Sequence, residues 1–157
     1  MLRRGDTGDW IGTFAGHKGA VWSAKLDNEA LLAATGAADF SAKVWDAITG
    51  QELMEFAQHK HIVKDVEFSA DRQSLATTGL EGVLRIFDLN SGSLTSEIRH
   101  EAEKVTVNKA LWGADGNTVL TGGAKGIVRV WDLRSGNKAG ELTVDGLIMD
   151  MELKPTP

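Results

Sequence analysis

Short runs of apolar residues alternate with turn residues along the whole chain. The run 83–87 is β-branched and aromatic, and turn residues bound it on both sides, which is typical of a β-strand. The run 62–68 is apolar at too many positions for a strand with one exposed face, so we expect it to be buried on both faces. The shorter, more polar run 52–56 is typical of an outer edge strand. No window of 11 or more residues has a capped helical period, and the pattern predicts an all-β protein.

The predicted strands recur with a fixed period. A hydroxyl residue followed by glycine begins at Thr7, Thr49, Ser91 and Ser135, at intervals of 42, 42 and 44 residues. An aromatic residue followed by aspartate recurs with the last two of these intervals, at Trp45-Asp46, Phe87-Asp88 and Trp131-Asp132. Each period contains turn signals for four short antiparallel strands, and four strands in this length are the period of a β-propeller blade.

With this period the sequence resembles the WD-repeat β-propeller family. The family's blade has a His before the inner strand, a Ser or Thr on the second strand, an Asp in the following turn and a Trp on the third strand. The resemblance implies that these side chains form a buried hydrogen-bonded chain, the structural tetrad, which fixes the register of the blade. The implied members in the three repeats are His17, Thr35, Asp39 and Trp45, then His59, Thr77 and Phe87, then Thr121 and Trp131.

The second and third repeats depart from this pattern. The second has Glu81 and Phe87, which we expect not to complete the chain in the same way. The third has Lys125 at the acidic position, and its histidine, His100, stands three residues further from the inner strand because a longer loop at 101–106 follows it.

The phase of the repeat predicts an incomplete arc of about three and a half four-stranded blades. Residues 1–15 are the last two strands of a preceding blade. Three WD blades follow at 16–57, 58–99 and 100–144, and residues 145–157 are the first strand of a following blade. A seven-bladed ring needs roughly 300 residues. We therefore expect either a piece of a longer propeller or an open arc that self-associates through its blade ends.

Composition narrows the class of function. The 157 residues carry a net charge of −5, which argues against direct nucleic-acid binding because phosphate binding normally requires a basic surplus. The absence of Cys excludes disulfides, thiolate zinc sites and cysteine nucleophiles. No apolar run approaches the roughly 18 residues of a membrane-spanning helix, so no membrane contact is expected.

No catalytic, cofactor or metal site is expected. His59 and His61 have no third ligand at a metal-like spacing, and His59 is assigned to the tetrad. The glycine-rich segment 121–126 lacks the spacing of a phosphate-binding loop and precedes a strand. The carboxylates that recur once per blade are turn or strand-end residues and not an acid–base pair: Asp46, Asp88 and Asp132.

The rim of the blades is the expected binding surface. In the WD-repeat family, contacts come from the start of the inner strand, which here places Trp22, Lys64 and Asn108 on the rim. An exposed aromatic residue is a typical interface anchor, although packing between blades is the alternative for Trp22. A small basic area, either a site for an acidic peptide or simply solvated, contains Lys18, Lys60, His61 and Lys64.

Longer strings resemble one branch of the family, at 5–14, 16–22, 37–47 and 59–64. The resemblance implies a non-catalytic scaffold in the cytoplasm, with the nucleus as a second location. Its implied partners are subunits of the SMN complex, which assembles spliceosomal ribonucleoproteins, an Unr-type RNA-binding protein, and TGF-β receptor and Smad components. A branch that serves translation initiation factor 3 is the alternative, and a propeller enzyme would need converging carboxylates, His or metal that are not evident.

Overall fold

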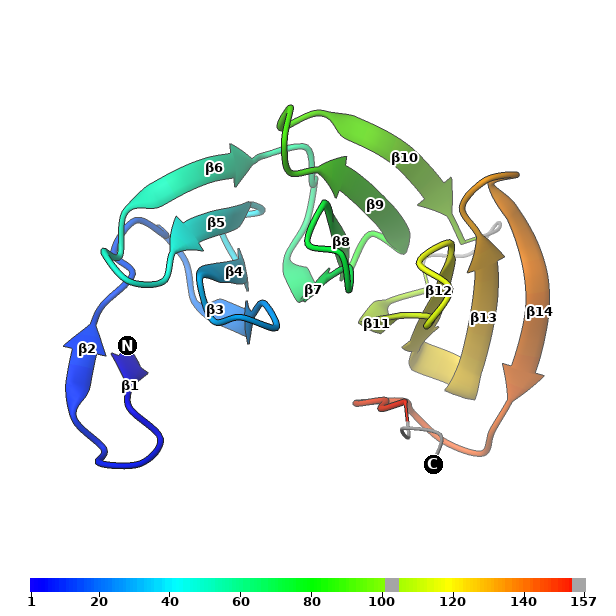
Figure 1. The fold of residues 1–157 in the computed structure, drawn as a ribbon. Coiled ribbons are helices and arrows are strands. Elements are labelled where there is room, and N and C mark those ends of the chain that lie inside the picture. Colours follow the sequence, from blue (N-terminus) through cyan, green and yellow to red (C-terminus); the bar gives the residue numbers. More distant parts are fainter. Residues whose placement is uncertain (101–104, 154–157) are drawn as a thin grey trace.

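Three four-stranded antiparallel sheets follow one another along the chain (Figure 1). The computed structural model describes residues 1–100 and 105–153. Strands within each sheet are paired in chain order. The strands of the first sheet are β3 (Val21–Leu26), β4 (Leu32–Ala37), β5 (Ala42–Asp46) and β6 (Glu52–Phe56). Those of the second sheet are β7 (Val63–Phe68), β8 (Ser74–Gly79), β9 (Val83–Asp88) and β10 (Leu94–Arg99). Those of the third sheet are β11 (Val107–Trp112), β12 (Thr118–Gly123), β13 (Ile127–Asp132) and β14 (Asn137–Thr143).

Two smaller elements complete the secondary structure of the described residues. Strands β1 (Leu2–Arg3) and β2 (Trp10–Gly12) pair antiparallel and precede the first sheet. A single 3₁₀ turn, η1 (Ala124–Gly126), joins β12 to β13. The chain is therefore nearly all-β, as the alternation of apolar and turn residues indicated.

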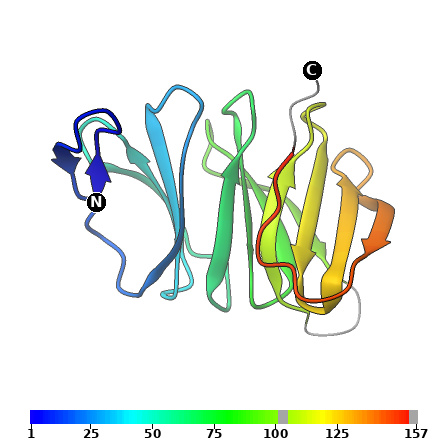
Figure 2. The same cartoon turned by 90° about the horizontal axis from the view of Figure 1, so that it is seen from below.

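The sheets are arranged as successive blades of an open arc. Strands β3, β7 and β11 line the concave side, and β6, β10 and β14 form the convex side (Figure 1). Seen from below, the three sheets stand side by side (Figure 2). The arc is not closed within the described residues, which confirms the prediction of an incomplete propeller.

The hydrophobic core lies between neighbouring sheets. One cluster packs Val44 and Phe56 of the first sheet against Val66, Leu75 and Phe87 of the second. Another cluster joins the second and third sheets through buried residues that include Leu84, Ile98, Trp112 and Trp131. Because each cluster takes side chains from two sheets, a blade depends on its neighbour for burial of its apolar surface.

The segment expected to begin a following blade does not form a strand in its described part, 145–153. The amide of Ile148 donates to the carbonyl of Gly123 (3.1 Å), and Nδ2 of Asn108 donates to the carbonyl of Ile148 (2.9 Å). The segment thus lies along the third sheet. A strand requires a ladder of backbone hydrogen bonds, and the described chain supplies no second strand to pair with it. Residues 154–157 of the expected strand, and 101–104 of the longer loop expected before the third blade, lie outside the described residues.

Close packing between blades predicts an effect of substitution at Gly36. A Cβ at this position in β4 would lie 2.7 Å from Cγ1 of the fully buried Val63 in the next sheet. Gly36→Ala should therefore lower the free energy of unfolding by about 1–3 kcal/mol through overpacking, measured by chemical denaturation.

Gly140→Ala in β14 is the matched control. Its added Cβ would meet only Val130, at 3.8 Å, which is an ordinary contact. The control should be as stable as the wild type, and equal losses in the two variants would contradict the packing argument.

Candidate functional site

Three backbone hydrogen bonds define one rim of the arc. The turn after the second strand of each blade donates to the segment before the inner strand: Ala38 to Ala20 (2.9 Å), Leu80 to Ile62 (3.1 Å) and Ala124 to Thr106 (3.0 Å). We call these turns and segments the upper rim. It consists of residues 17–22 and 38–41 in the first blade, 59–64 and 80–82 in the second, and 105–108 and 124–126 in the third. The expected tetrad histidines, His17 and His59, and the expected binding residues belong to this end of the sheets.

In the first blade the structure brings the four tetrad residues together. Nδ1 of His17 lies 2.9 Å from Oδ2 of Asp39, and Nε2 lies 2.7 Å from Oγ1 of Thr35. The indole N–H of Trp45 also donates to Oγ1 of Thr35 (2.8 Å). Since a carboxylate only accepts, Nδ1 of His17 bears the proton, and in the neutral ring the hydroxyl of Thr35 donates to Nε2.

The carboxylate of Asp39 is the best-satisfied group of this tetrad. It accepts the amide of Lys18 (2.8 Å) and both the amide (3.2 Å) and the hydroxyl (2.8 Å) of Ser41. Burial raises the pKa of Asp39, but hydrogen bonds from His17, Lys18 and Ser41 outweigh burial and lower the pKa to about 2. The anion is therefore maintained at any physiological pH.

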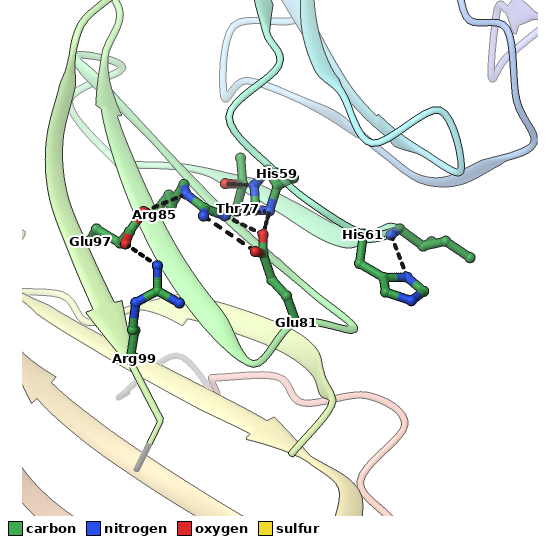
Figure 3. A network of polar contacts seen from close by, with 8 residues as sticks. His59, His61, Thr77, Glu81, Arg85, Glu97 and Arg99 are labelled. Carbon is green, nitrogen blue, oxygen red and sulfur yellow. Dashed lines mark hydrogen bonds and ion pairs between the residues drawn. The ribbon is translucent and has the colours of Figure 1, made fainter. Parts of the chain in front are cut away.

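The second blade completes its chain differently, and the expectation for Glu81 needs correction (Figure 3). Oε1 of Glu81 lies 2.6 Å from Nδ1 of His59, whose Nε2 lies 2.7 Å from Oγ1 of Thr77, so the longer Glu side chain takes the place of Asp. Phe87 cannot donate a hydrogen bond and instead stacks on Phe56, with ring centroids 4.3 Å apart. The acidic end of the chain is thus retained, and only its aromatic end is replaced by packing.

A buried cation, Arg85, joins the second tetrad (Figure 3). Its side chain is 1% exposed, forms an ion pair with Glu81 and lies 2.8 Å from Nδ1 of His59. Its Nε donates to Glu97 (2.9 Å), which also pairs with Arg99. Burial raises the pKa of Glu81, but hydrogen bonds from His59 and Arg85 lower it to about 2. Burial lowers the pKa of His59, and the nearby charge of Arg85 adds to this while Glu81 opposes it.

In the third blade His100 occupies the tetrad position despite its distance from the strand. Its Nε2 lies 3.2 Å from Oγ1 of Thr121, which also accepts the indole N–H of Trp131 (2.8 Å). Nη1 of Arg129 lies 3.0 Å from Nδ1 of His100, where the other blades have a carboxylate. Burial, followed by the charge of Arg129, lowers the pKa of His100 to about 4.

The proton on His100 is therefore on the opposite nitrogen from that on His17. A guanidinium only donates, so Nδ1 of His100 accepts from Arg129 and the neutral ring has its proton on Nε2. Nε2 then donates to Thr121, whose hydroxyl oxygen has lone pairs for both His100 and Trp131. The same fold position accommodates either tautomer.

The sequence-based set omitted the cations of the third strands and two tetrad members, Glu81 and His100. Each third strand has one cation paired with Glu on the outer strand: Lys43 with Glu52 and Glu55, Arg85 with Glu97, and Arg129 with Glu141. The available signal was the basic residue that recurs two positions before Trp45, Phe87 and Trp131. For Glu81 the signal was its alignment with Asp39.

The expected rim residues make three different contacts. The side chain of Trp22 is 53% exposed, and Nζ of Lys64 from the next blade lies 3.5 Å from its ring centroid. His61 lies against Phe40, with ring centroids 5.8 Å apart, and points away from the tetrad network (Figure 3). Asn108 donates to Ile148 and is not part of this group. Lys18 and Lys60 are exposed on the same rim.

One further buried group, Asp65, was not anticipated and links the three blades. Its carboxylate accepts the hydroxyl of Ser23 (2.9 Å), the amide of Ala110 (3.0 Å) and the ammonium of Lys109 (3.4 Å). Ser23, Asp65 and Lys109 occupy the same position on β3, β7 and β11, at intervals of 42 and 44 residues. This carboxylate fixes neighbouring inner strands relative to one another below the rim.

The described part of the chain contains neither a metal-binding cluster nor a membrane-spanning helix. Across residues 1–100 and 105–153, no group of three or more His, Cys, Asp or Glu side chains is arranged to hold a metal ion. In the same part of the chain, no helix has the length and apolar character needed to cross a membrane.

Comparisons with known proteins identify the repeat and two groups of relatives. The family model "WD domain, G-beta repeat" matches residues 8–46, 50–88 and 92–132. The chain is 56% identical over 112 residues to the serine-threonine kinase receptor-associated protein of Homo sapiens, covering 71% of this chain and 31% of that protein. It is 49% identical over 89 residues to the protein of the same name from Dictyostelium discoideum, covering 57% of this chain and 30% of that protein.

A second group of relatives is more distant. Eukaryotic translation initiation factor 3 subunit I of Debaryomyces hansenii is 36% identical over 115 residues, covering 64% of this chain and 33% of that protein. The chain spans about a third of the length of the curated relatives it matches.

The lowered pKa of His100 predicts a loss of stability in mild acid. The unfolded histidine takes up a proton near pH 6.5 and the folded one near pH 4, so the unfolded state binds more protons between these values. The free energy of unfolding should fall as the pH is lowered through this window, by up to about 3 kcal/mol from His100.

Denaturation curves between pH 7 and pH 4.5 measure this effect. His100→Gln, whose amide N–H can replace Nε2–H as the donor to Thr121, should have a shallower pH dependence than the wild type. The pKa values of Asp39 and Glu81 are both about 2, so their stabilising effect is lost as the pH falls from about 4.5 to 2, below this window. An unchanged slope in the variant would contradict the assignment to His100.

Removal of Glu81 should strongly destabilise the second blade. Glu81→Ala leaves the buried Arg85 with Glu97 as its one counter-ion among the described residues, and breaking a buried ion pair costs about 3 kcal/mol or more. Glu141→Ala is the control, because it removes a carboxylate from the more exposed pair with Arg129. Urea denaturation should show a clearly larger loss for Glu81→Ala, and similar losses would contradict the role of burial.

Proposed function

Because the chain belongs to the WD domain, G-beta repeat family, we propose that it is a non-catalytic scaffold that binds partner proteins on the upper rim of its blades. The buried His, Thr, Asp and Glu side chains are bonded to one another and hold the loops onto the sheets. These groups are therefore used for structure, and the chemistry available to a partner is that of the rim.

The observation that supports this function best is the exposed pair of Trp22 and Lys64. A tryptophan that is 53% exposed at the start of an inner strand is a large apolar surface on a rigid frame. Interface energies depend strongly on such aromatic anchors. Lys64 orients the ring through a cation–π contact between blades, so the anchor is ordered before a partner binds.

We further propose the partner set that the similarity supports. The relatives with 49–56% identity are named for association with serine-threonine kinase receptors, and the corresponding proposal here is receptor and Smad components of TGF-β signalling. The proposed partners also include SMN-complex subunits and an Unr-type RNA-binding protein, without direct nucleic-acid contact, in the cytoplasm and also the nucleus. Self-association through the exposed residues Val21 and Leu26 of β3 is part of the same proposal.

The second candidate is a subunit of translation initiation factor 3. It is favoured by the 36% identity to subunit I, which the chain matches over 64% of its length. The identity to the receptor-associated proteins is higher, and we rank the initiation-factor function second for that reason.

Affinity capture from cell extract followed by mass spectrometry tests the function. The wild-type chain should retain a defined set of proteins, and Trp22→Ala should lose most of them because the anchor is removed. SMN-complex or receptor components among the retained proteins favour the first candidate, and initiation-factor subunits favour the second.

The folding control is thermal unfolding of both proteins, with midpoints expected to agree because Trp22 is exposed. A wild-type chain that retains no protein above background would contradict the scaffold function. Equal retention by the variant would remove Trp22 from the site.

A further inference from the structure

The turn between β4 and β5 places a strained aromatic residue on the upper rim. Phe40 has a φ of 69°, in the left-handed region that bulky residues rarely adopt. The equivalent turns of the next two blades have Gly82 and Gly126, with φ of 69° and 67°. Backbone strain of this kind persists where surrounding contacts enforce it and clusters at functional sites.

Only the first blade has room for a side chain at this position. A Cβ at Gly82 would lie 2.5 Å from the carbonyl oxygen of Val105, and one at Gly126 would lie 2.0 Å from that of Val144. Phe40 is instead 43% exposed, so a large part of its surface faces solvent although its backbone is strained. Folding of this blade does not explain the choice of phenylalanine.

The rings exposed on the rim come from two adjacent blades. Phe40 lies against His61, and Trp22 lies against Lys64, so each pair joins the first blade to the second. The hydrogen bond from Ala38 to Ala20 places the turn that bears Phe40 beside the strand start that bears Trp22. The exposed rings therefore belong to one continuous stretch of the rim.

The lysines of this stretch differ in their ion pairs from those of β3, β5, β11 and β14. Lys18, Lys60 and Lys64 form no ion pair with any described residue. The lysines of β3, β5, β11 and β14 all do: Lys25, Lys43, Lys109 and Lys138. Within the described segments of the upper rim the carboxylates are Asp39 and Glu81, which are bonded to His17 and His59 and are only 14% and 11% exposed. A cationic surface thus exists on a chain with a net charge of −5.

We propose that the aromatic–lysine rim, formed by Lys18, Trp22, Phe40, Lys60, His61 and Lys64, binds an extended acidic peptide segment of a partner protein. The rings of Trp22 and Phe40 contact an apolar side chain of the peptide, and the lysines pair with its Asp and Glu residues. The inference rests on the proposed scaffold function and names the chemistry of one of its partners. The overall negative charge disfavours the phosphate backbone of RNA as the occupant.

Fluorescence anisotropy with the whole 157-residue chain tests the proposal. The probe is a fluorescein-labelled dodecapeptide of Asp and Glu residues around a central leucine, and its Asn and Gln counterpart is the neutral control. The acidic peptide should bind at least about tenfold more tightly than the neutral one, and the difference should shrink as salt is raised.

Phe40→Gly separates binding from folding. It removes the ring and relieves the left-handed strain, so it should bind the acidic peptide about tenfold more weakly while being at least as stable as the wild type. Ala30→Gly is the matched control, because Ala30 also has a positive φ (54°) but lies in the turn between β3 and β4, away from the upper rim. This control should leave the affinity unchanged within about twofold.

The charge is tested with Lys60→Gln/Lys64→Gln against Lys138→Gln, which removes an exposed lysine from β14. Only the double variant should weaken binding, again by about tenfold. Equal affinity for the acidic and neutral peptides, wild-type affinity in Phe40→Gly, or binding of a single-stranded RNA in preference to the acidic peptide would each overturn the proposal.

Partner capture with Phe40→Gly distinguishes a failure of the scaffold function from a failure of the proposed peptide-binding rim. If the wild type captures no partner, the scaffold function fails whatever the peptide does. If the wild type and Phe40→Gly capture the same partners, the scaffold function stands and the proposal for this rim fails.

Discussion

The hydrogen bond between a loop histidine and a threonine of the second strand is the contact on which the rim depends. It is present in all three blades, with Nε2 to Oγ1 distances of 2.7, 2.7 and 3.2 Å. The bond fastens the segment before each inner strand to the centre of its own sheet. Loops otherwise have little burial to fix them, so this buried contact is what turns the rim into a defined surface.

The charge of the group that faces Nδ1, the other nitrogen of the histidine ring, differs from blade to blade. A carboxylate faces Nδ1 of His17, a Glu–Arg pair faces that of His59, and among the described residues an arginine faces that of His100. Histidine tolerates all three because either ring nitrogen can bear the proton. The cost is a dependence on pH, since only the neutral ring suits the site beside Arg129.

Local patterning predicted the strands and their period, and the family resemblance implied the complete tetrad of the first blade. It did not predict the place of His100, because the loop before the third blade has a different length and the ring reaches the same site from further along the chain. It also missed Arg85, since a charged side chain is expected at the surface unless its partners are known. Those partners come from a turn and from the outer strand, so the pairing of Arg85 with Glu81 and Glu97 exists only in the folded blade.

The tetrad and the strained turn of the first blade are held by the same carboxylate, that of Asp39. Asp39 accepts hydrogen bonds from the amide and the hydroxyl of Ser41, on the far side of Phe40, while it also bonds His17. These bonds, with that from the amide of Phe40 to Ala37 (3.3 Å), hold the left-handed turn against a strain of about 1–3 kcal/mol. The carboxylate that orients the buried histidine therefore also holds the phenylalanine outward, and a change that releases Asp39 alters the blade's register and its rim together.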